Sequence, residues 1–192
     1  FKESLDAKWH QKNLMNKGSL LDHYALIGDG YYLDGEIESE QFGQEAWLQE
    51  HPEYEKYDFI SEGDSPSYFY LLQTRLRGFE HPSFGGWGGR FTEIQPKTYT
   101  TEKTVDYNPH TQRFEQEYNL YRWIKDIQAD FAARAQWCVT ADFESASHYP
   151  KVSLTEENVK AKAGDRLTLE ASAQDPNGGQ LTYKWWCYHE AS

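Results

Sequence analysis

An acidic pair flanks a glycine in the stretch Glu-Gly-Asp-Ser-Pro at 62–66, which follows a strand-like run at 57–60 and precedes an apolar run at 68–72. The end of a strand just before a helix is where α/β proteins place their ligands. Asp64 could therefore ligate a hard cation such as Ca²⁺, and Glu62 could be a second ligand or transfer a proton. The alternative is an ordinary helix N-cap, in which Asp64 accepts hydrogen bonds from backbone amides and Glu62 is solvated. Spacing alone favours the cap.

A loop with four glycines follows at 85–91, in the order Gly-Gly-Trp-Gly-Gly-Arg-Phe. So many glycines leave the backbone permissive, so the segment is predicted to be irregular and to approach another element closely. Trp87 could stack on a sugar ring while Arg90 reaches a hydroxyl or a carboxylate. Alternatively, Trp87 fills the edge of the core and Arg90 pairs with a helix acid or a carbonyl. His81, just before Pro82, could donate a proton, although an exposed histidine in a turn is the commoner role.

The element that is clearest in the sequence is a helix at 118–138. Its apolar residues fall on one stripe, at Leu120, Ile124, Ile127, Phe131 and Ala135. Weaker signals predict short helices within 6–26 and 42–50, a helix that begins near Asp64 or Ser65, and an extended polar excursion at 98–113.

Short strands and turns replace the helical pattern after residue 148. Strands are predicted at 151–154, 158–163, 166–171 and 181–185, with turns at 164–165 and 175–179. Trp185 is expected in the core of a β-sandwich, with Trp186 on the opposite face of its strand. A sandwich needs about seven strands and about 100 residues, so this segment holds only the beginning of one. We therefore expect two units, 1–148 and 149–192.

Composition and missing motifs exclude several classes of protein. A net charge of -12 makes the surface a poor match for nucleic acid, and no run of about 18 apolar residues indicates a membrane span. The sequence lacks a nucleophile elbow, a Cys-x-x-Cys pair, histidines spaced for zinc and a phosphate-binding loop. Cys138 and Cys187 fall in different units, so no disulfide is expected. Aromatic residues make up 16% of the protein, which suits stacking on sugars or a core of large rings.

Five stretches occur together in one order: EGDSPSYFYLL at 62–72, EHP at 80–82, WGGRF at 87–91, DFAAR at 130–134 and WC at 137–138. In this combination they resemble the bacterial cellulose-binding, nucleoside-hydrolase-like family. The stretch DPNGGQLTYKWW at 175–186 resembles the start of the immunoglobulin-like C-terminal domain of the same proteins. The resemblance implies an α/β fold, in which the C-terminal part of a nucleoside-hydrolase-like domain precedes the first strands of an immunoglobulin-like β-sandwich.

The resemblance also implies a chemistry, the attack of a Ca²⁺-held water on an anomeric carbon. Asp64 matches a metal-ligating aspartate that occurs late in nucleoside hydrolases. Gly63 stands where those enzymes carry a catalytic histidine, which leaves Glu62 and His81 as candidate catalytic residues. The aromatic loop would then bind the substrate through Trp87 and Arg90, in addition to the metal ligand Asp64.

Two functions stay open, because a calcium site needs several oxygen ligands and no Asp-x-Asp-x-x-x-Asp-Asp cluster occurs in the sequence. The sequence begins with Phe1 rather than Met, so we expect the C-terminal half of a longer protein whose N-terminal half supplies the cluster. That protein would hydrolyse glycosyl or N-glycosyl bonds with Ca²⁺. The alternative is a non-catalytic carbohydrate-binding module. A carbohydrate or nucleoside ligand and a secreted or periplasmic location are implied by the resemblance alone.

Overall fold

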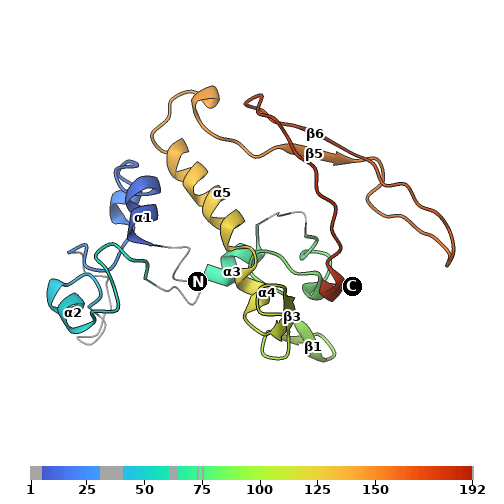
Figure 1. Ribbon diagram of the computed structural model, residues 1–192, viewed down its shortest axis with the longest axis horizontal. Coiled ribbons are helices and arrows are strands. Elements are labelled where there is room, and N and C mark those ends of the chain that lie inside the picture. The colour runs from blue at the N-terminus through green and yellow to red at the C-terminus, as the bar shows by residue number, and fades with distance from the viewer. Residues whose placement is uncertain (1–5, 31–40, 61–64, 73, 75, 192) are drawn as a thin grey trace.

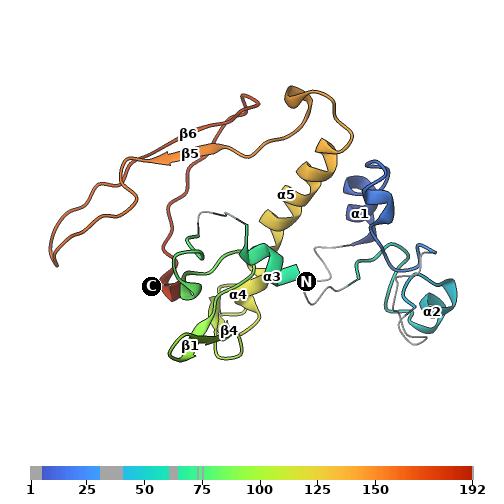
Figure 2. The same cartoon turned by 180° about the vertical axis from the view of Figure 1, so that it is seen from behind.

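The computed structural model describes residues 6–30, 41–60, 65–72, 74 and 76–191, and it divides into two parts. Helices and two short hairpins up to residue 148 form what we call the body (Figure 1). A long hairpin at 149–185, here called the arm, extends away from it. The opposite view shows that the C-terminal residues return to the body (Figure 2).

The body begins with helix α1 (Ala7–Asn13), which is capped by Asp6. The Asp6 carboxylate accepts a hydrogen bond from the backbone N–H of Trp9 at 2.7 Å, which satisfies one of the free donors at the helix start. Helix α1 contacts the long helix α5 (Ile124–Trp137), and its residue His10 is almost fully buried. The helix predicted within 6–26 is therefore confirmed.

A less regular segment connects α1 to the glycine-rich loop. It contains the 3₁₀-helix η2 (Leu21–His23) and helix α2 (Glu45–Glu50), which confirms the helix predicted within 42–50. The strand-like run at 57–60 pairs only briefly, through a bridge between Leu26 and Phe59 and backbone hydrogen bonds of Ile27 with Tyr57 and Asp58.

The glycine-rich loop at 85–91 is irregular, as predicted, and follows helix α3 (Ser65–Tyr70) and the 3₁₀-helix η4 (Pro82–Phe84). It passes close to both α3 and helix α4 (Tyr118–Tyr121). A Cβ atom on Gly88 would lie 2.6 Å from the backbone nitrogen of Tyr70, and one on Gly89 would lie 2.5 Å from Oδ1 of Asn119. Glycine at these two positions therefore allows the loop to pack against two helices.

Two antiparallel hairpins occupy the region that the sequence predicts as an extended excursion. Strand β1 (Thr92–Gln95) pairs with β2 (Thr98–Thr100), and β3 (Asp106–Asn108) pairs with β4 (Arg113–Glu115). The segment 98–113, expected to be an extended excursion or an insertion, is thus extended in part, but the pairing of its strands into hairpins was not predicted. These strands are only three or four residues long, too short for an alternating pattern to stand out in the sequence.

The single helix expected at 118–138 is two helices, α4 and α5. They are separated at Arg122 and Trp123, where Trp123 has φ -96° and ψ 0°. The apolar spacing runs through the break without interruption, so periodicity alone could not reveal it. At this break, Arg122 and Trp123 both contact the C-terminal segment.

The arm is one antiparallel hairpin, built from β5 (Lys151–Leu154) and β6 (Ala171–Gln174), and it follows the 3₁₀-helix η5 (Phe143–Ser145). The other strands predicted in this unit, at 158–163, 166–171 and 181–185, are not formed, apart from Ala171, which is the first residue of β6. A strand needs a neighbour that accepts and donates its backbone hydrogen bonds, and these segments have none along the arm. After the arm, the described residues end in the 3₁₀-helix η6 (His189–Ala191).

The structure also bears on three predictions made from composition and pattern. No helix among the described residues is long and apolar enough to cross a membrane. The two cysteines are free and exposed, so they form no disulfide, as expected. Trp185 and Trp186 were expected to divide between a core and a surface, but both are about half exposed, because no second sheet covers the arm in the described part of the protein.

Candidate functional site

The residues predicted to carry chemistry fall into two groups. Glu62 and Asp64 lie outside the described residues, so their predicted catalytic and metal-binding roles stay predictions. The other three, His81, Trp87 and Arg90, lie within ten positions of one another, at the start of η4 and in the glycine-rich loop. Trp87 is half-buried, and its predicted contact with a sugar also stays a prediction.

His81 is held at the start of η4 by contacts to both of its ring nitrogens. Nδ1 accepts a hydrogen bond from the backbone N–H of Ser83 at 3.3 Å and lies 2.8 Å from the Ser83 hydroxyl. Nε2 lies 3.4 Å from the hydroxyl of Tyr99. The imidazole is half-buried and contacts the rings of Phe84 and Tyr99. These contacts fix the orientation of His81, while its role as a proton donor stays a prediction.

Arg90 is buried, and its guanidinium group is occupied within the protein. Nε and Nη2 donate hydrogen bonds to Oδ1 of Asp106 at 3.0 and 2.8 Å, and Nη2 also donates to the carbonyl of Val105 at 3.1 Å. The backbone N–H of Arg90 donates to Oδ1 of Asn119. The sequence left open a pairing of Arg90 with a helix acid or a carbonyl; the structure shows pairing with both an acid and a carbonyl, but the acid, Asp106, lies on strand β3.

Asp106 is the centre of this cluster and is 0% exposed. Its Oδ1 accepts both hydrogen bonds from Arg90. Its Oδ2 accepts one from Nη1 of Arg122 at 2.7 Å and one from the hydroxyl of Tyr188 at 2.6 Å. A buried carboxylate is stable only when it is paired and its lone pairs are satisfied, and these four hydrogen bonds meet that condition. No local pattern indicates this cluster, because its members lie far apart in the sequence.

Tyr188 is the donor that comes from the C-terminal segment. Burial, followed by the hydrogen bond to Asp106, raises the pKa of the Tyr188 phenol well above its ordinary value. The phenol is therefore protonated across the physiological pH range and is held as a hydrogen-bond donor to the carboxylate.

A second polar cluster joins the β3–β4 hairpin to α4. The Glu115 carboxylate accepts hydrogen bonds from Asn108, Thr111 and Tyr121. These bonds, that of Asn108 first, lower the pKa of Glu115 to about 2, and burial together with the Glu115 contact raises the pKa of Tyr121 to about 12. Glu115 is therefore an anion with its oxygens occupied, which indicates a structural role.

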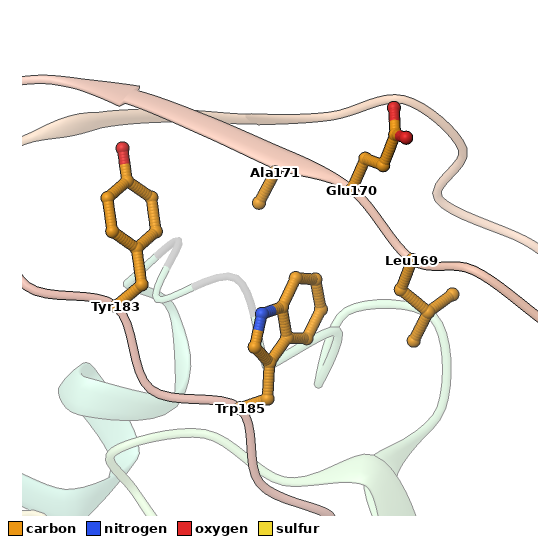
Figure 3. A pocket seen from close by; sticks show the side chains of 5 residues that line it. All are labelled: Leu169, Glu170, Ala171, Tyr183 and Trp185. Atoms are coloured by element: carbon orange, nitrogen blue, oxygen red, sulfur yellow. The ribbon is translucent and has the colours of Figure 1, made fainter.

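The arm carries a hollow of about 450 Å³ that sequence analysis did not predict. It is lined by residues from the start of β6 and from the extended segment opposite, namely Leu169, Glu170, Ala171, Tyr183 and Trp185. Figure 3 shows the rings of Tyr183 and Trp185 projecting toward the strand that carries Ala171, with the Leu169 side chain beside Trp185. The two aromatic residues are 57% and 56% exposed. We call this hollow the arm groove.

The arm groove has a weak signal in the sequence. Tyr183 and Trp185 are two residues apart, so in an extended segment their side chains fall on the same side. From the sequence, only Trp185 was predicted in a sandwich core, because alternation at 181–185 is typical of a strand. No group of three or more His, Cys, Asp or Glu side chains that could hold a metal ion occurs in the described part of the protein.

Comparison with known proteins shows which family the N-terminal part of this protein resembles. Residues 2–91 match a family described as the nucleoside hydrolase-like domain of cellulose-binding Sde182. All five residues predicted to carry chemistry, from Glu62 to Arg90, lie within this range. The resemblance to the cellulose-binding, nucleoside-hydrolase-like family that the sequence indicated is therefore confirmed. No curated protein matches this one.

A solved structure extends the similarity beyond residue 91. It is a nucleoside hydrolase-related hypothetical protein from Saccharophagus degradans that is associated with carbohydrate metabolism. The two are 28% identical with a TM-score of 0.54, and the similarity covers 88% of this protein. The matched region spans 42% of that protein's length. The structure of helices and small antiparallel sheets is thus similar to part of a nucleoside hydrolase-related protein.

Proposed function

We propose that this protein binds carbohydrate, and that the arm groove is the surface that does so. The observation that supports this most is the exposure of two aromatic rings, Tyr183 and Trp185, along one side of a hollow. Exposed aromatic patches beside a concavity are typical of ligand surfaces, because the rings gain free energy when a ligand covers them. The apolar faces of pyranose rings suit such a surface, and the polar edges of the two side chains suit sugar hydroxyls.

The comparisons support the same class of ligand. The family that matches residues 2–91 is described as cellulose-binding, and the similar solved structure is described as associated with carbohydrate metabolism. Both descriptions concern other proteins. They make a β-linked glucan the first ligand to test for this one.

Retention on insoluble cellulose tests the proposal with a matched pair of variants. Tyr183→Ala removes a ring from the arm groove, whereas Tyr149→Ala removes a similarly exposed tyrosine, 68% exposed, that does not line it. We expect Tyr183→Ala to reduce affinity about twofold to tenfold, which corresponds to about 0.5–1.5 kcal/mol of lost ring stacking. Tyr149→Ala should bind as the unmodified protein does. Equal binding by all three proteins would exclude the arm groove as the surface.

A second candidate function is hydrolysis of glycosyl or N-glycosyl bonds by a longer protein that contains this sequence. The favouring observation is that Glu62, Asp64 and His81 all lie in the segment that matches a nucleoside hydrolase-like domain. Asp64 would ligate Ca²⁺ together with residues from outside this sequence of 192, and Glu62 or His81 would transfer the proton. Release of base or reducing sugar that stops when calcium is chelated, in a longer protein only, is the expected result.

The alternative to a binding role for the arm groove is that the arm is the start of an immunoglobulin-like domain. It is supported by the antiparallel pairing of β5 and β6 and by the apolar residues that this hairpin leaves exposed, among them Val152 and Leu169. In a longer protein, a second sheet would then cover Trp185. Loss of cellulose retention when the protein is extended beyond Ser192 would favour a core role for Trp185 over a sugar-binding role.

A further inference from the structure

The last described residues do not continue along the arm but return to the body, where Figure 1 shows the C-terminus beside the hairpin that contains β3. Two hydrogen bonds fix this return. The Tyr188 hydroxyl donates to Oδ2 of Asp106 at 2.6 Å, and the backbone N–H of Tyr107 donates to Oε1 of Glu190 at 2.9 Å. These partners are 82 and 83 residues apart in the sequence, so the contacts are tertiary rather than local.

Charge complementarity identifies the kind of segment that this surface of the body accepts. Arg90 and Arg122 bring two positive charges to the single negative charge of Asp106, which leaves an excess of one positive charge. Glu190 supplies the missing negative charge, with its Oε2 at 4.0 Å from Nη1 of Arg122. Arg122 is largely buried, so solvent screens this excess charge less than it would at the surface.

Aromatic contacts give the segment its apolar complement. Trp123 is 9% exposed, and its ring lies 5.7 Å from Trp186 and 5.8 Å from Tyr188, which lie 5.7 Å from each other. The Arg122 guanidinium lies over the Tyr188 ring at 4.4 Å from its centre, closer than to the other rings it contacts. A cation over an aromatic face is attracted by the electron density of that face. The C-terminal segment thus presents a hydroxyl, a carboxylate and two rings to a surface that matches all of them.

The other end of the arm is held to the body as well. The Asn177 side chain accepts a hydrogen bond from the backbone N–H of His148 at 3.0 Å and donates one to the carbonyl of Ala146 at 2.9 Å. His148 is in turn stacked on Phe143 and Trp137. The arm is therefore attached at its base by Asn177 and after its last residue by the segment 186–190.

We propose that residues 186–190 are a latch, and that Arg90, Asp106, Arg122 and Trp123 form its docking surface on the body. The latch holds the arm in one orientation relative to the body, which a flexible tether between two units would not do. Because Tyr183 and Trp185 lie immediately before the latch, docking also fixes the direction in which the arm groove faces. The proposal does not depend on what the arm groove binds.

The two native cysteines allow a direct test on the whole protein. Cys138 lies at the end of α5 and Cys187 lies within the latch, and both thiols are exposed, so each can carry a nitroxide spin label. Pulsed dipolar spectroscopy then measures the distribution of distances between body and latch. We expect one narrow peak for the unmodified sequence. Labelled and unlabelled proteins should have the same thermal midpoint, which checks that the label at position 187 does not displace the latch.

Variants distinguish a latch, which fixes the orientation of the arm, from a flexible tether, which does not. Tyr188→Ala should replace the narrow peak by a broad distribution, while Tyr183→Ala, which removes a ring from the arm outside the latch, should leave the peak unchanged. A narrow peak in Tyr188→Ala would overturn the proposal, as would a broad distribution in the unmodified protein. If Tyr188→Ala loses its helical circular dichroism, Glu190→Gln decides instead. It removes one charge at nearly constant size, and a distribution no broader than that of the unmodified protein would likewise overturn the proposal.

Discussion

The hydroxyl of Tyr188 donates a 2.6 Å hydrogen bond to Oδ2 of Asp106, a carboxylate with no exposed surface that lies 82 residues earlier in the sequence. The same carboxylate is paired with Arg90 and Arg122. One buried acid thus connects the glycine-rich loop, the β3–β4 hairpin, the break between α4 and α5, and the C-terminal segment. This arrangement makes the cluster a structural centre of the body. Removal of the Asp106 carboxylate should therefore lower the free energy of unfolding.

The variant Asp106→Ala tests how much this cluster stabilises the folded state. Breaking a buried ion pair leaves uncompensated charge, which typically reduces the free energy of unfolding by about 3–5 kcal/mol. Asp130→Ala is the matched control, because it removes a helix ion pair whose partner Arg134 is half exposed. Such a pair contributes about 0.3–0.5 kcal/mol. Urea denaturation measures both, and similar losses for the two variants would contradict a structural role for the Asp106 cluster.

His10 should make the stability of the protein depend on pH. Burial lowers its pKa from 6.5, so the folded state keeps it neutral while the unfolded state takes up a proton below that value. The free energy of unfolding should therefore fall as the pH is reduced below 6.5, and the fall should level off below the folded-state pKa. His10→Gln, whose side chain does not titrate, should show a smaller fall across this window than the unmodified protein. Parallel pH profiles of stability for the two proteins would exclude His10 as a source of the pH dependence.

Glu115 should contribute stability in a more acidic range. Its pKa is lowered from 4.5 to about 2, so its hydrogen bonds stabilise the fold above pH 4.5 and are lost as the pH falls from 4.5 toward 2. Glu115→Gln removes the titrating group, and its stability should change less than that of the unmodified protein over this range. Carbon-13 chemical shifts of the Glu115 carboxyl measure the pKa directly, and a value near 4.5 would contradict the hydrogen-bonded arrangement.

Two glycines have nearly the same backbone angle but different surroundings. Comparing their alanine variants distinguishes the effect of backbone strain on stability from the effect of close packing. Gly89 has φ 93° and Gly164 has φ 94°, but a Cβ on Gly89 would lie 2.5 Å from Oδ1 of Asn119, whereas one on Gly164 would meet nothing within 4 Å. Gly164→Ala should cost about 1–2 kcal/mol for the left-handed backbone alone. Gly89→Ala should cost more, because the loop must also move away from α4. Equal losses in thermal denaturation would show that close packing at Gly89 is absent.

Local patterns predicted local structure, and the tertiary contacts lay beyond them. The capping residue Asp6 and the apolar stripe ending at Ala135 act through neighbours in the sequence, so their helices could be predicted from it. The irregular loop at 85–91 could be predicted because four glycines leave its backbone permissive, whereas the helices that Gly88 and Gly89 contact could not. The break at Trp123 could not, because the apolar spacing continues across it and the ring contacts that Trp123 makes there come from the docked C-terminal segment. The pairing of Arg90 with Asp106 likewise joins two elements whose approach depends on the whole fold.

In the arm, by contrast, a local pattern predicted a strand that is not formed. Alternation at 181–185 is typical of a strand, but a strand forms only where a neighbour completes its hydrogen bonds, and this part of the arm has none. The residues that were expected in a core are exposed for the same reason. Of the residues predicted to form a site, His81 and Arg90 lie in the described part of the protein, whereas Glu62 and Asp64 lie outside it.

Calorimetric titration of a soluble β-linked gluco-oligosaccharide into the whole protein tests the central claim, that the arm groove binds carbohydrate, most directly. We expect saturable binding by the unmodified protein that is weakened at least about twofold in Trp185→Ala. Binding should be unchanged in Tyr149→Ala. Affinity that is the same in Trp185→Ala, or no heat of binding with any of the three proteins, would contradict it.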